Sequence, residues 1–256
     1  MAGFHAAVFG FASARSLAWG IASAWQAAGA SVTVGIQSER FRGALEAAAA
    51  AWPAPPHVVA CDVCDDASLD AAFAAIAARS GGALHALAHS VAFAPAAAMR
   101  APLLRTTRAD FAAAHDASAY SLLALAARAE PLLAAASPRG SVLALSYLGA
   151  ARAAPNYRVM GAAKASLEAC ARGLAAELGP RGIRVNVLSV GPVHTLAARG
   201  IADFRALSEA AAARAPLQRG VTLAEVGSAA VFLSSAAGSG VTGQTLYVDA
   251  GLSAVV

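Results

Sequence analysis

Three side chains in the second half of the sequence are of types that could carry out acid–base chemistry together: Tyr147, Tyr157 and Lys164. Lys164 is the only lysine, beside 18 arginines, and it follows Tyr157 by seven residues. Seven residues is close to two helical turns, so both side chains would lie on one helix face. An ammonium beside a phenol lowers the phenol pKa. The spacing therefore predicts a proton donor and a cofactor clamp, although an amphipathic helix with a snorkelling lysine would have the same spacing.

A second set of residues is of the types that a dinucleotide site uses. The turn after Gly10 leads from a strand into a helix, whose free N–H groups could bind a pyrophosphate, although G-x-G-x-x-G is absent. Gln37 ends the second expected strand, where the adenosine ribose would be read. Glu39 would repel a 2′-phosphate and Arg40 would attract one, so NADH is favoured and NADPH is the alternative. Asp62 could accept a hydrogen bond from the adenine amino group, or it could cap a helix or form a turn.

Short apolar strands alternate with long helices rich in Ala and Leu, and these elements must position the site. Few polar residues interrupt the strands, which is typical of a parallel sheet buried on both faces. The expected strands are 6–9, 31–36, 57–60, 83–88, 141–145, 184–189 and 245–248, and the expected helices are 16–28, 39–51, 68–79, 111–135, 157–178 and 223–234. This order predicts an α/β fold, a Rossmann-type doubly wound parallel sheet of about seven strands with helices on both faces, in a single domain over 1–256.

The segment around 191–216 interrupts the alternation, because it follows a strand without immediately forming a long helix. In an open α/β sheet, loops after the strand ends line the ligand crevice. The segment is therefore predicted to be a substrate lid. A fixed surface insertion is the alternative.

Composition limits the class of protein. Hydrophobic residues make up 58% and mean hydropathy is +0.57, but the two long charge-free stretches, 16–38 and 226–248, contain Gly, Ser and Thr. Neither is a run of about 20 strongly apolar residues, and no signal peptide is recognised, so we expect a soluble, cytoplasmic protein with no membrane partner. Three cysteines argue against a disulfide framework, and Cys61-x-x-Cys64 has no second pair for zinc.

Charge gives one further hint. The net charge is +4, but the arginines are dispersed and no nucleic-acid-binding module is recognised. We therefore expect no nucleic-acid partner. Arg100, Arg105 and Arg108 could form a patch for an acidic partner, whereas compositional drift toward arginine would also explain them.

With these residues in view, the chain resembles the short-chain dehydrogenases/reductases over nearly its whole length. Within them it is similar to the bacterial and plastid enoyl-acyl-carrier-protein reductases, in which six residues separate the tyrosine from the lysine, rather than three. The strongest matching segments are Leu145-Ser146-Tyr147-Leu148-Gly149, Pro155-Asn156-Tyr157, Met160-Gly161 and Lys164-Ala165-Ser166-Leu167-Glu168. Further matches are 16–22, 89–95, 115–116, 118–121, 184–186, 191–192, 195–197 and 248–249.

The resemblance implies a homotetramer that uses NADH to reduce the double bond of a trans-2-enoyl thioester, carried by acyl carrier protein or coenzyme A, in fatty-acid synthesis. Tyr157 would bond the thioester oxygen, Lys164 would hold the nicotinamide ribose and Tyr147 would line the substrate side. The implied NADH contacts are Gly10, Ser16, Leu17, Gln37, Asp62, Val63, Ser90, Val91, Leu145, Lys164, Val193 and Thr195. The implied substrate contacts are Ala92, Phe93, Ala94, Tyr147, Tyr157, Met160, Ala197 and Phe204.

The sequence departs from the family pattern at a few places. Ala92 stands where many relatives have glycine, and Phe11-Ala12 and Ala250 are also unusual. The catalytic set is intact, so activity is expected, while the preferred substrate size is open. The alternatives are a divergent short-chain dehydrogenase/reductase paralogue that acts on another acyl, keto or alcohol substrate in a secondary pathway, and a nucleotide-binding protein without catalysis.

Overall fold

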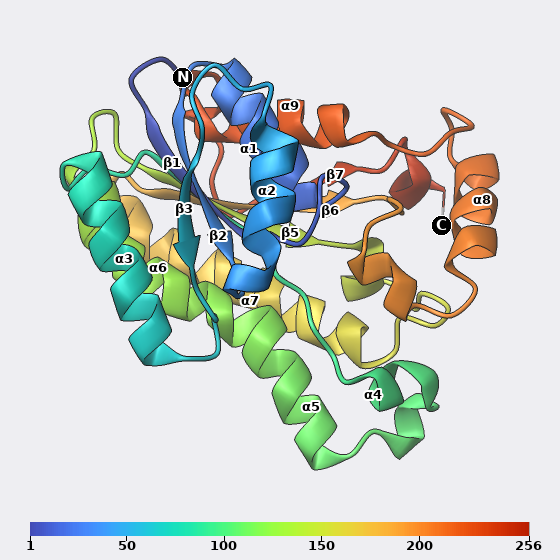
Figure 1. The fold of residues 1–256 in the computed structure, drawn as a ribbon. Helices are drawn as coiled ribbons and strands as arrows, with labels where there is room; N and C mark the ends of the chain where they lie inside the picture. Colours follow the sequence, from blue (N-terminus) through green and yellow to red (C-terminus); the bar gives the residue numbers. More distant parts are fainter. Residues whose placement is uncertain (256) are drawn as a thin grey trace.

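The seven predicted strands form one parallel sheet in a computed structural model of the protein (Figure 1). The structure describes residues 1–255, apart from the side chains of residues 197 and 199. The strands are β1 His5–Phe11, β2 Ser31–Ile36, β3 His57–Ala60, β4 Ala86–His89, β5 Ser141–Ser146, β6 Arg184–Val190 and β7 Thr245–Val248. Their order is β3-β2-β1-β4-β5-β6-β7, and the direction of winding reverses between β1 and β4. The prediction of a doubly wound α/β fold is confirmed.

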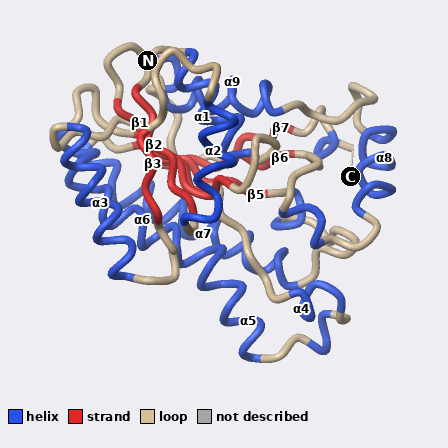
Figure 2. The backbone as a smooth tube through the Cα atoms, in the orientation of Figure 1, coloured by secondary structure: helices blue, strands red, loops and turns tan. Residues whose placement is uncertain are grey.

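Helices cover both faces of the sheet, which forms the central layer in Figure 2. One face packs against α1 Leu17–Ala27, α2 Arg42–Ala49 and α9 Leu223–Ser234, and the other against α3 Asp66–Ser80, α6 Ser121–Ala135 and α7 Val159–Leu178. In β1, Ala6 and Val8 belong to the first core, while Ala7 and Phe9 belong to the second. Because successive strand side chains point to opposite faces, an almost continuous apolar strand fills two cores.

Several boundaries differ from those predicted. The expected helix 111–135 is three elements, α5 Arg108–His115, a π-helical turn Asp116–Tyr120 and α6. Helix α5 starts before the predicted residue 111 because the Thr107 side chain accepts a hydrogen bond from the Asp110 amide and caps α5. The expected helix 157–178 begins only at Val159, so Tyr157 lies in the turn before it. Strand β4 is shorter than predicted and also extends one residue further.

Two helices lie outside the two layers (Figure 1). One is α4 Ala96–Arg100, which was not predicted, and the other is α8 Phe204–Arg214, within the segment expected to be a lid. A 3-10 turn, Ala197–Gly200, precedes α8. Among the helices of residues 1–255, none is long and apolar enough to cross a membrane. The same residues contain no group of three or more His, Cys, Asp or Glu arranged to hold a metal ion.

Candidate active site

A cavity of about 600 Å³ opens at the carboxyl ends of the strands, where the sheet changes its direction of winding. Open α/β sheets bind ligands at this place. Every residue predicted to contact cofactor or substrate lines this cavity except Ala197, whose side chain lies outside the described part of the structure. Segments far apart in the sequence therefore meet at one site. The roles of the individual residues remain predictions.

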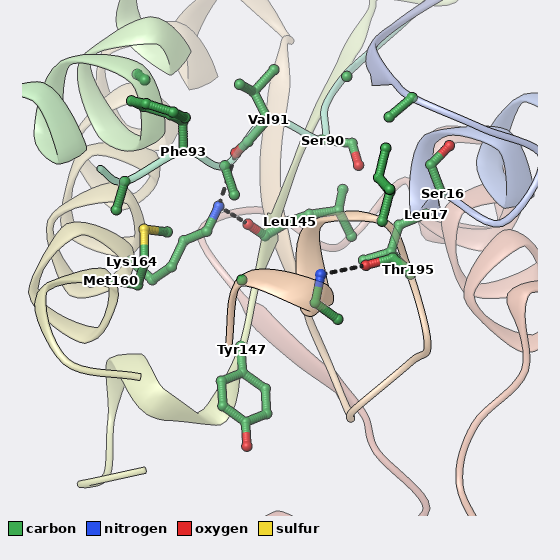
Figure 3. Close-up of a pocket in the computed structure, with 18 of the residues that line it drawn as sticks. Ser16, Leu17, Ser90, Val91, Phe93, Leu145, Tyr147, Met160, Lys164 and Thr195 are labelled. Atoms are coloured by element: carbon green, nitrogen blue, oxygen red, sulfur yellow. Dashed lines mark hydrogen bonds between the residues drawn. The ribbon is translucent and has the colours of Figure 1, made fainter. Parts of the chain in front are cut away.

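Lys164 crosses the floor of the cavity between two strand ends (Figure 3). Its ammonium donates hydrogen bonds to the carbonyl oxygens of Leu145, at 2.7 Å, and Val91, at 3.1 Å. The side chain is 4% exposed, and burial lowers the pKa of Lys164 to about 7, against the opposing influence of Glu168. An ammonium carries three N–H donors. Two of them bond to protein, which leaves one for a ligand in the cavity.

A buried carboxyl group lies one helical turn beyond Lys164. Glu168 is 9% exposed, and its Oε1 accepts a hydrogen bond of 2.6 Å from the hydroxyl of Ser146, the last residue of β5. A buried carboxylate needs such donors to offset its desolvation. Its negative charge favours the ammonium form of Lys164. The sequence analysis did not assign a role to Glu168.

Tyr157 is buried, with its ring edge-on to Tyr147 at a centroid distance of 4.8 Å. The expectation that Lys164 lowers the pKa of Tyr157 is wrong. Burial raises the pKa of Tyr157 well above its usual range, and Tyr147 and Glu168 raise it further. The Lys164 ammonium bonds to two backbone carbonyls instead of acting on the phenol. The Tyr157 hydroxyl therefore keeps its proton at neutral pH and can donate a hydrogen bond.

Two glycines allow the Tyr157 ring to sit where it does. A Cβ on Gly149 would lie 2.9 Å from Cε1 of Tyr157 and closer still to Cδ1. A Cβ on Gly161 would lie 2.9 Å from the carbonyl oxygen of Gly149. The turn after β5 and the first turn of α7 thus pack directly against each other, and the Tyr157 ring packs against Gly149.

Tyr147 directly follows β5 and lies at the outer part of the cavity. Figure 3 shows its ring pointing away from the Lys164 ammonium. Burial raises the pKa of Tyr147, so its hydroxyl is also protonated at neutral pH. Its ring contacts the ring of Tyr157, whereas Lys164 lies in the inner part of the cavity.

The inner part of the cavity suits a dinucleotide. Gly10 has a φ of +105°, and a Cβ there would lie 2.6 Å from the Ser90 carbonyl carbon and closer to its oxygen. Only glycine lets the end of β1, where the register shifts between Phe9 and Phe11, approach the segment after β4 so closely. The Ser16 side chain caps α1 by accepting a hydrogen bond from the Trp19 amide, and Ser16 and Leu17 at the start of α1 line the cavity. A helix start of this kind favours a phosphate group.

The expected adenosine end of the cavity has polar groups that are already oriented. The Gln37 Oε1 accepts a hydrogen bond of 3.2 Å from Arg40, so the amide N–H groups of Gln37 stay available. Glu39 pairs with Arg42, which partly neutralises the carboxylate that would repel a 2′-phosphate. Asp62 lines the cavity and also accepts from the Cys64 amide at 3.0 Å. Both readings of Asp62, as a turn residue and as a ligand contact, are compatible with this geometry.

The apolar cavity residues that were not predicted from the sequence include Met99 of α4, Leu207 of α8 and Ile201 between the 3-10 turn and α8. They lie on short elements, in which no long hydrophobic pattern indicates the buried face. The sequence analysis also gave no role to His89. That side chain is fully buried at the end of β4, with Nε2 2.7 Å from the Ser121 hydroxyl.

Comparison with known proteins agrees with this geometry. The family described as Enoyl-(Acyl carrier protein) reductase matches residues 10–253. The enoyl-[acyl-carrier-protein] reductase [NADH] FabI of Salmonella typhimurium is 42% identical over 254 residues, which cover 99% of this chain and 95% of that protein. The FabI of Neisseria meningitidis serogroup B is 45% identical, covering 96% of this chain and 93% of its own length.

Solved structures agree as well. The Bacillus cereus enoyl-acyl carrier protein reductase with NADP+ and indole naphthyridinone has a TM-score of 0.95 at 40% identity, and the match covers 100% of this chain and 98% of that one. The Anaplasma phagocytophilum enzyme in complex with NAD has a TM-score of 0.93 at 40% identity, covering 100% of this chain and 95% of that one. The chain therefore belongs to the enoyl-(acyl carrier protein) reductase family.

Proposed function

We propose that the protein uses NADH to reduce the carbon–carbon double bond of a trans-2-enoyl thioester on acyl carrier protein, giving the saturated acyl thioester in fatty-acid synthesis. The observation that carries the proposal is the pair of residues in the cavity, a protonated, buried Tyr157 and a Lys164 ammonium with one free donor. The relatives that match over nearly the whole chain are named as NADH-dependent enoyl reductases. Their names support the same reaction here.

Tyr157 acts on the oxygen of the substrate. A bound reduced nicotinamide would supply a hydride to the β-carbon, negative charge would develop on the thioester oxygen, and a proton taken up from water at the α-carbon would complete the saturated thioester. The Tyr157 hydroxyl donates a hydrogen bond to that oxygen, since burial keeps it protonated. A donor aimed at charge that forms during the reaction stabilises the transition state more than the ground state. Tyr147 packs edge-on against this ring and limits its movement.

Lys164 orients the cofactor. Its third N–H binds a ribose hydroxyl, while the carbonyls of Leu145 and Val91 fix the ammonium in place. At the adenosine end, the Gln37 amide group binds ribose hydroxyls and the start of α1 binds the pyrophosphate. The other predicted NADH contacts shape the walls around these groups.

The acyl chain lies in the apolar outer half of the cavity. Phe93, Met160 and Phe204 belong to its lining, and Ala92 adds a methyl group where many relatives have glycine. These walls exclude water from the reacting atoms, which strengthens the hydrogen bond from Tyr157. The segment 191–216, which includes α8, is the proposed lid.

The proposal includes a homotetramer in the cytoplasm. Exposed apolar side chains on α9 and β7 support assembly, because an uncovered edge strand with apolar residues favours association. They are Phe232, Leu246 and Tyr247. The molar mass of the protein in solution, measured by light scattering, tests the tetramer directly.

The test of the activity is NADH oxidation with short and long enoyl thioesters on both acyl carrier protein and coenzyme A, with NADPH in parallel. Tyr157→Phe should lower kcat about 10²- to 10³-fold, which is typical of the loss of one donor to a developing oxyanion. Tyr120→Phe is the matched control, because Tyr120 is 55% exposed and outside the cavity. The proposal fails if no enoyl thioester is reduced, or if both variants behave alike. Turnover of ketones or alcohols instead would indicate the divergent paralogue.

A further inference from the structure

The turn that carries Tyr157 has an unusual backbone. The residues on both sides of the tyrosine have positive φ although neither is glycine: Asn156 at 59° and Arg158 at 47°. Asparagine tolerates this region. Arg158, with ψ of −127°, has the conformation of the first central residue of a type II′ turn, where glycine is strongly preferred. Such a conformation costs free energy and persists only where the surroundings hold it.

Each of these two side chains donates a hydrogen bond to a segment that contributes residues to the cavity lining. The Arg158 Nε donates a hydrogen bond of 3.2 Å to the carbonyl oxygen of Met99 in α4. The Asn156 Nδ2 donates one of 3.0 Å to the carbonyl oxygen of Ala202, just before α8. Arg158 also donates a hydrogen bond to the Asn156 Oδ1 at 3.4 Å, so the two side chains hold each other in place.

Apolar packing connects the same segments. Met99, Tyr157 and Met160 belong to one buried cluster, and Ile201 packs against it. Met99 and Ile201 also line the cavity. The polar and the apolar contacts therefore join α4, the lid and the tyrosine turn into one unit at the place where a long acyl chain would leave the reacting centre.

We propose that Asn156 and Arg158 are positioning residues that tie the two walls of the acyl entrance, α4 and the lid, to the Tyr157 turn and so set how well long acyl chains bind. They act through the carbonyls of Met99 and Ala202 and do not touch the reacting atoms. The nature of the substrate rests on the proposed function, whereas the tie between the segments rests on the hydrogen bonds alone.

Glycine variants test the loss of the side-chain hydrogen bonds without adding backbone strain. Asn156→Gly and Arg158→Gly remove the hydrogen bonds, and glycine accepts both backbone conformations, so both variants should fold. Amide hydrogen exchange needs no substrate. Arg158→Gly should speed exchange mainly in 96–105, and Asn156→Gly mainly in 196–204, each roughly two- to tenfold, as expected for the loss of one net hydrogen bond.

Arg152→Ala is the matched control. Arg152 is exposed on the same loop, and within residues 1–255 its side chain donates a hydrogen bond only to the neighbouring Ala151 carbonyl. It should leave exchange in both segments as in the parent protein. Equal exchange in all three variants and the parent would overturn the tie between the segments, whether or not the protein reduces enoyl thioesters.

Kinetics tests the consequence for the substrate. In both glycine variants, the ratio of KM for a dodecenoyl thioester to KM for a crotonyl thioester should rise roughly two- to tenfold, with a smaller change in kcat. A merely structural loss would lower the activity toward both chain lengths alike, and that result would overturn the proposal. If the parent protein reduced neither thioester, the proposed function would fail, while the exchange result would still decide the tie.

Discussion

The position of the Tyr157 ring can be tested by a single methyl group. In Gly149→Ala the new Cβ would lie 2.9 Å from Cε1 of Tyr157 and closer still to Cδ1. Favourable carbon–carbon contacts are about 3.5–4.0 Å. The ring must therefore move by on the order of 1 Å, because the backbone of Gly149 is itself packed against α7.

Such a shift displaces the hydroxyl that would bond the substrate oxygen. A misplacement of about 1 Å can cost on the order of 10²-fold in rate, or roughly 2.7 kcal/mol of transition-state stabilisation. We expect Gly149→Ala to lower kcat/KM for an enoyl thioester by about that factor. Overpacking should also lower the free energy of unfolding by about 1–3 kcal/mol. The dissociation constant for NADH, measured by calorimetry, should change far less than kcat, since Gly149 is not part of the cavity lining.

Gly173→Ala provides the matched control. Gly173 lies in α7, and a Cβ there would meet no other atom within 4 Å. Alanine is preferred over glycine inside a helix by about 0.5–1 kcal/mol, so this variant should melt higher and remain fully active. The reasoning is refuted if Gly149→Ala melts as the parent protein does and keeps its kcat/KM.

Three further outcomes are expected. Lys164→Arg should raise the dissociation constant for NADH about tenfold or more in a fluorescence titration, because a planar guanidinium cannot replace a compact ammonium between two carbonyls; unchanged affinity would contradict the assigned role. Burial, followed by the charge of Lys164, lowers the pKa of His89 to about 3, so the unfolded chain binds more protons below its ordinary pKa of about 6.5. The free energy of unfolding should then fall by up to about 1.4 kcal/mol per pH unit as the pH drops from 6.5 toward 3, and His89→Gln should flatten this slope in urea titrations. Replacing the exposed Arg100, Arg105 and Arg108 with alanine should raise KM for a carrier-protein substrate and leave KM for a coenzyme A substrate unchanged. Added salt should reduce the difference in KM between the variant and the parent protein. An equal effect on both substrates would show that the patch does not bind the carrier.

The parts of the fold that sequence predicts well are those with a strong local signal. The apolar runs that become β2, β3 and β7 were located to the residue, because each is a short run of mostly apolar residues that turn signals separate from the neighbouring helices. Helix α9 was also located to the residue, with Thr222 and Glu225 forming a capping box. Helix α4 has five residues, too few to show a periodicity.

The candidate site was predicted in outline but not in its electrostatics. The seven-residue spacing predicted that Tyr157 and Lys164 lie close together, and both line one cavity, although Tyr157 lies before the helix rather than on it. The partners of the Lys164 ammonium are backbone carbonyls, which every residue has, so no side-chain pattern could identify them. The positive φ angles on both sides of Tyr157 were hidden for a similar reason, since arginine at position 158 does not signal positive φ.

The bonds of Lys164 also determine when the site can form during synthesis of the chain. One partner lies 73 residues before the lysine and the other 19, so the ammonium closes two long loops at once. A nascent chain that has emerged only through β5 contains Gly10, Gln37 and Asp62 of the cavity, but lacks Lys164 and the segment 191–216. We therefore expect NADH to stabilise the protein most strongly once α7 has docked on the sheet and Lys164 is in place. NADH fluorescence during refolding would thus report the completion of the C-terminal half.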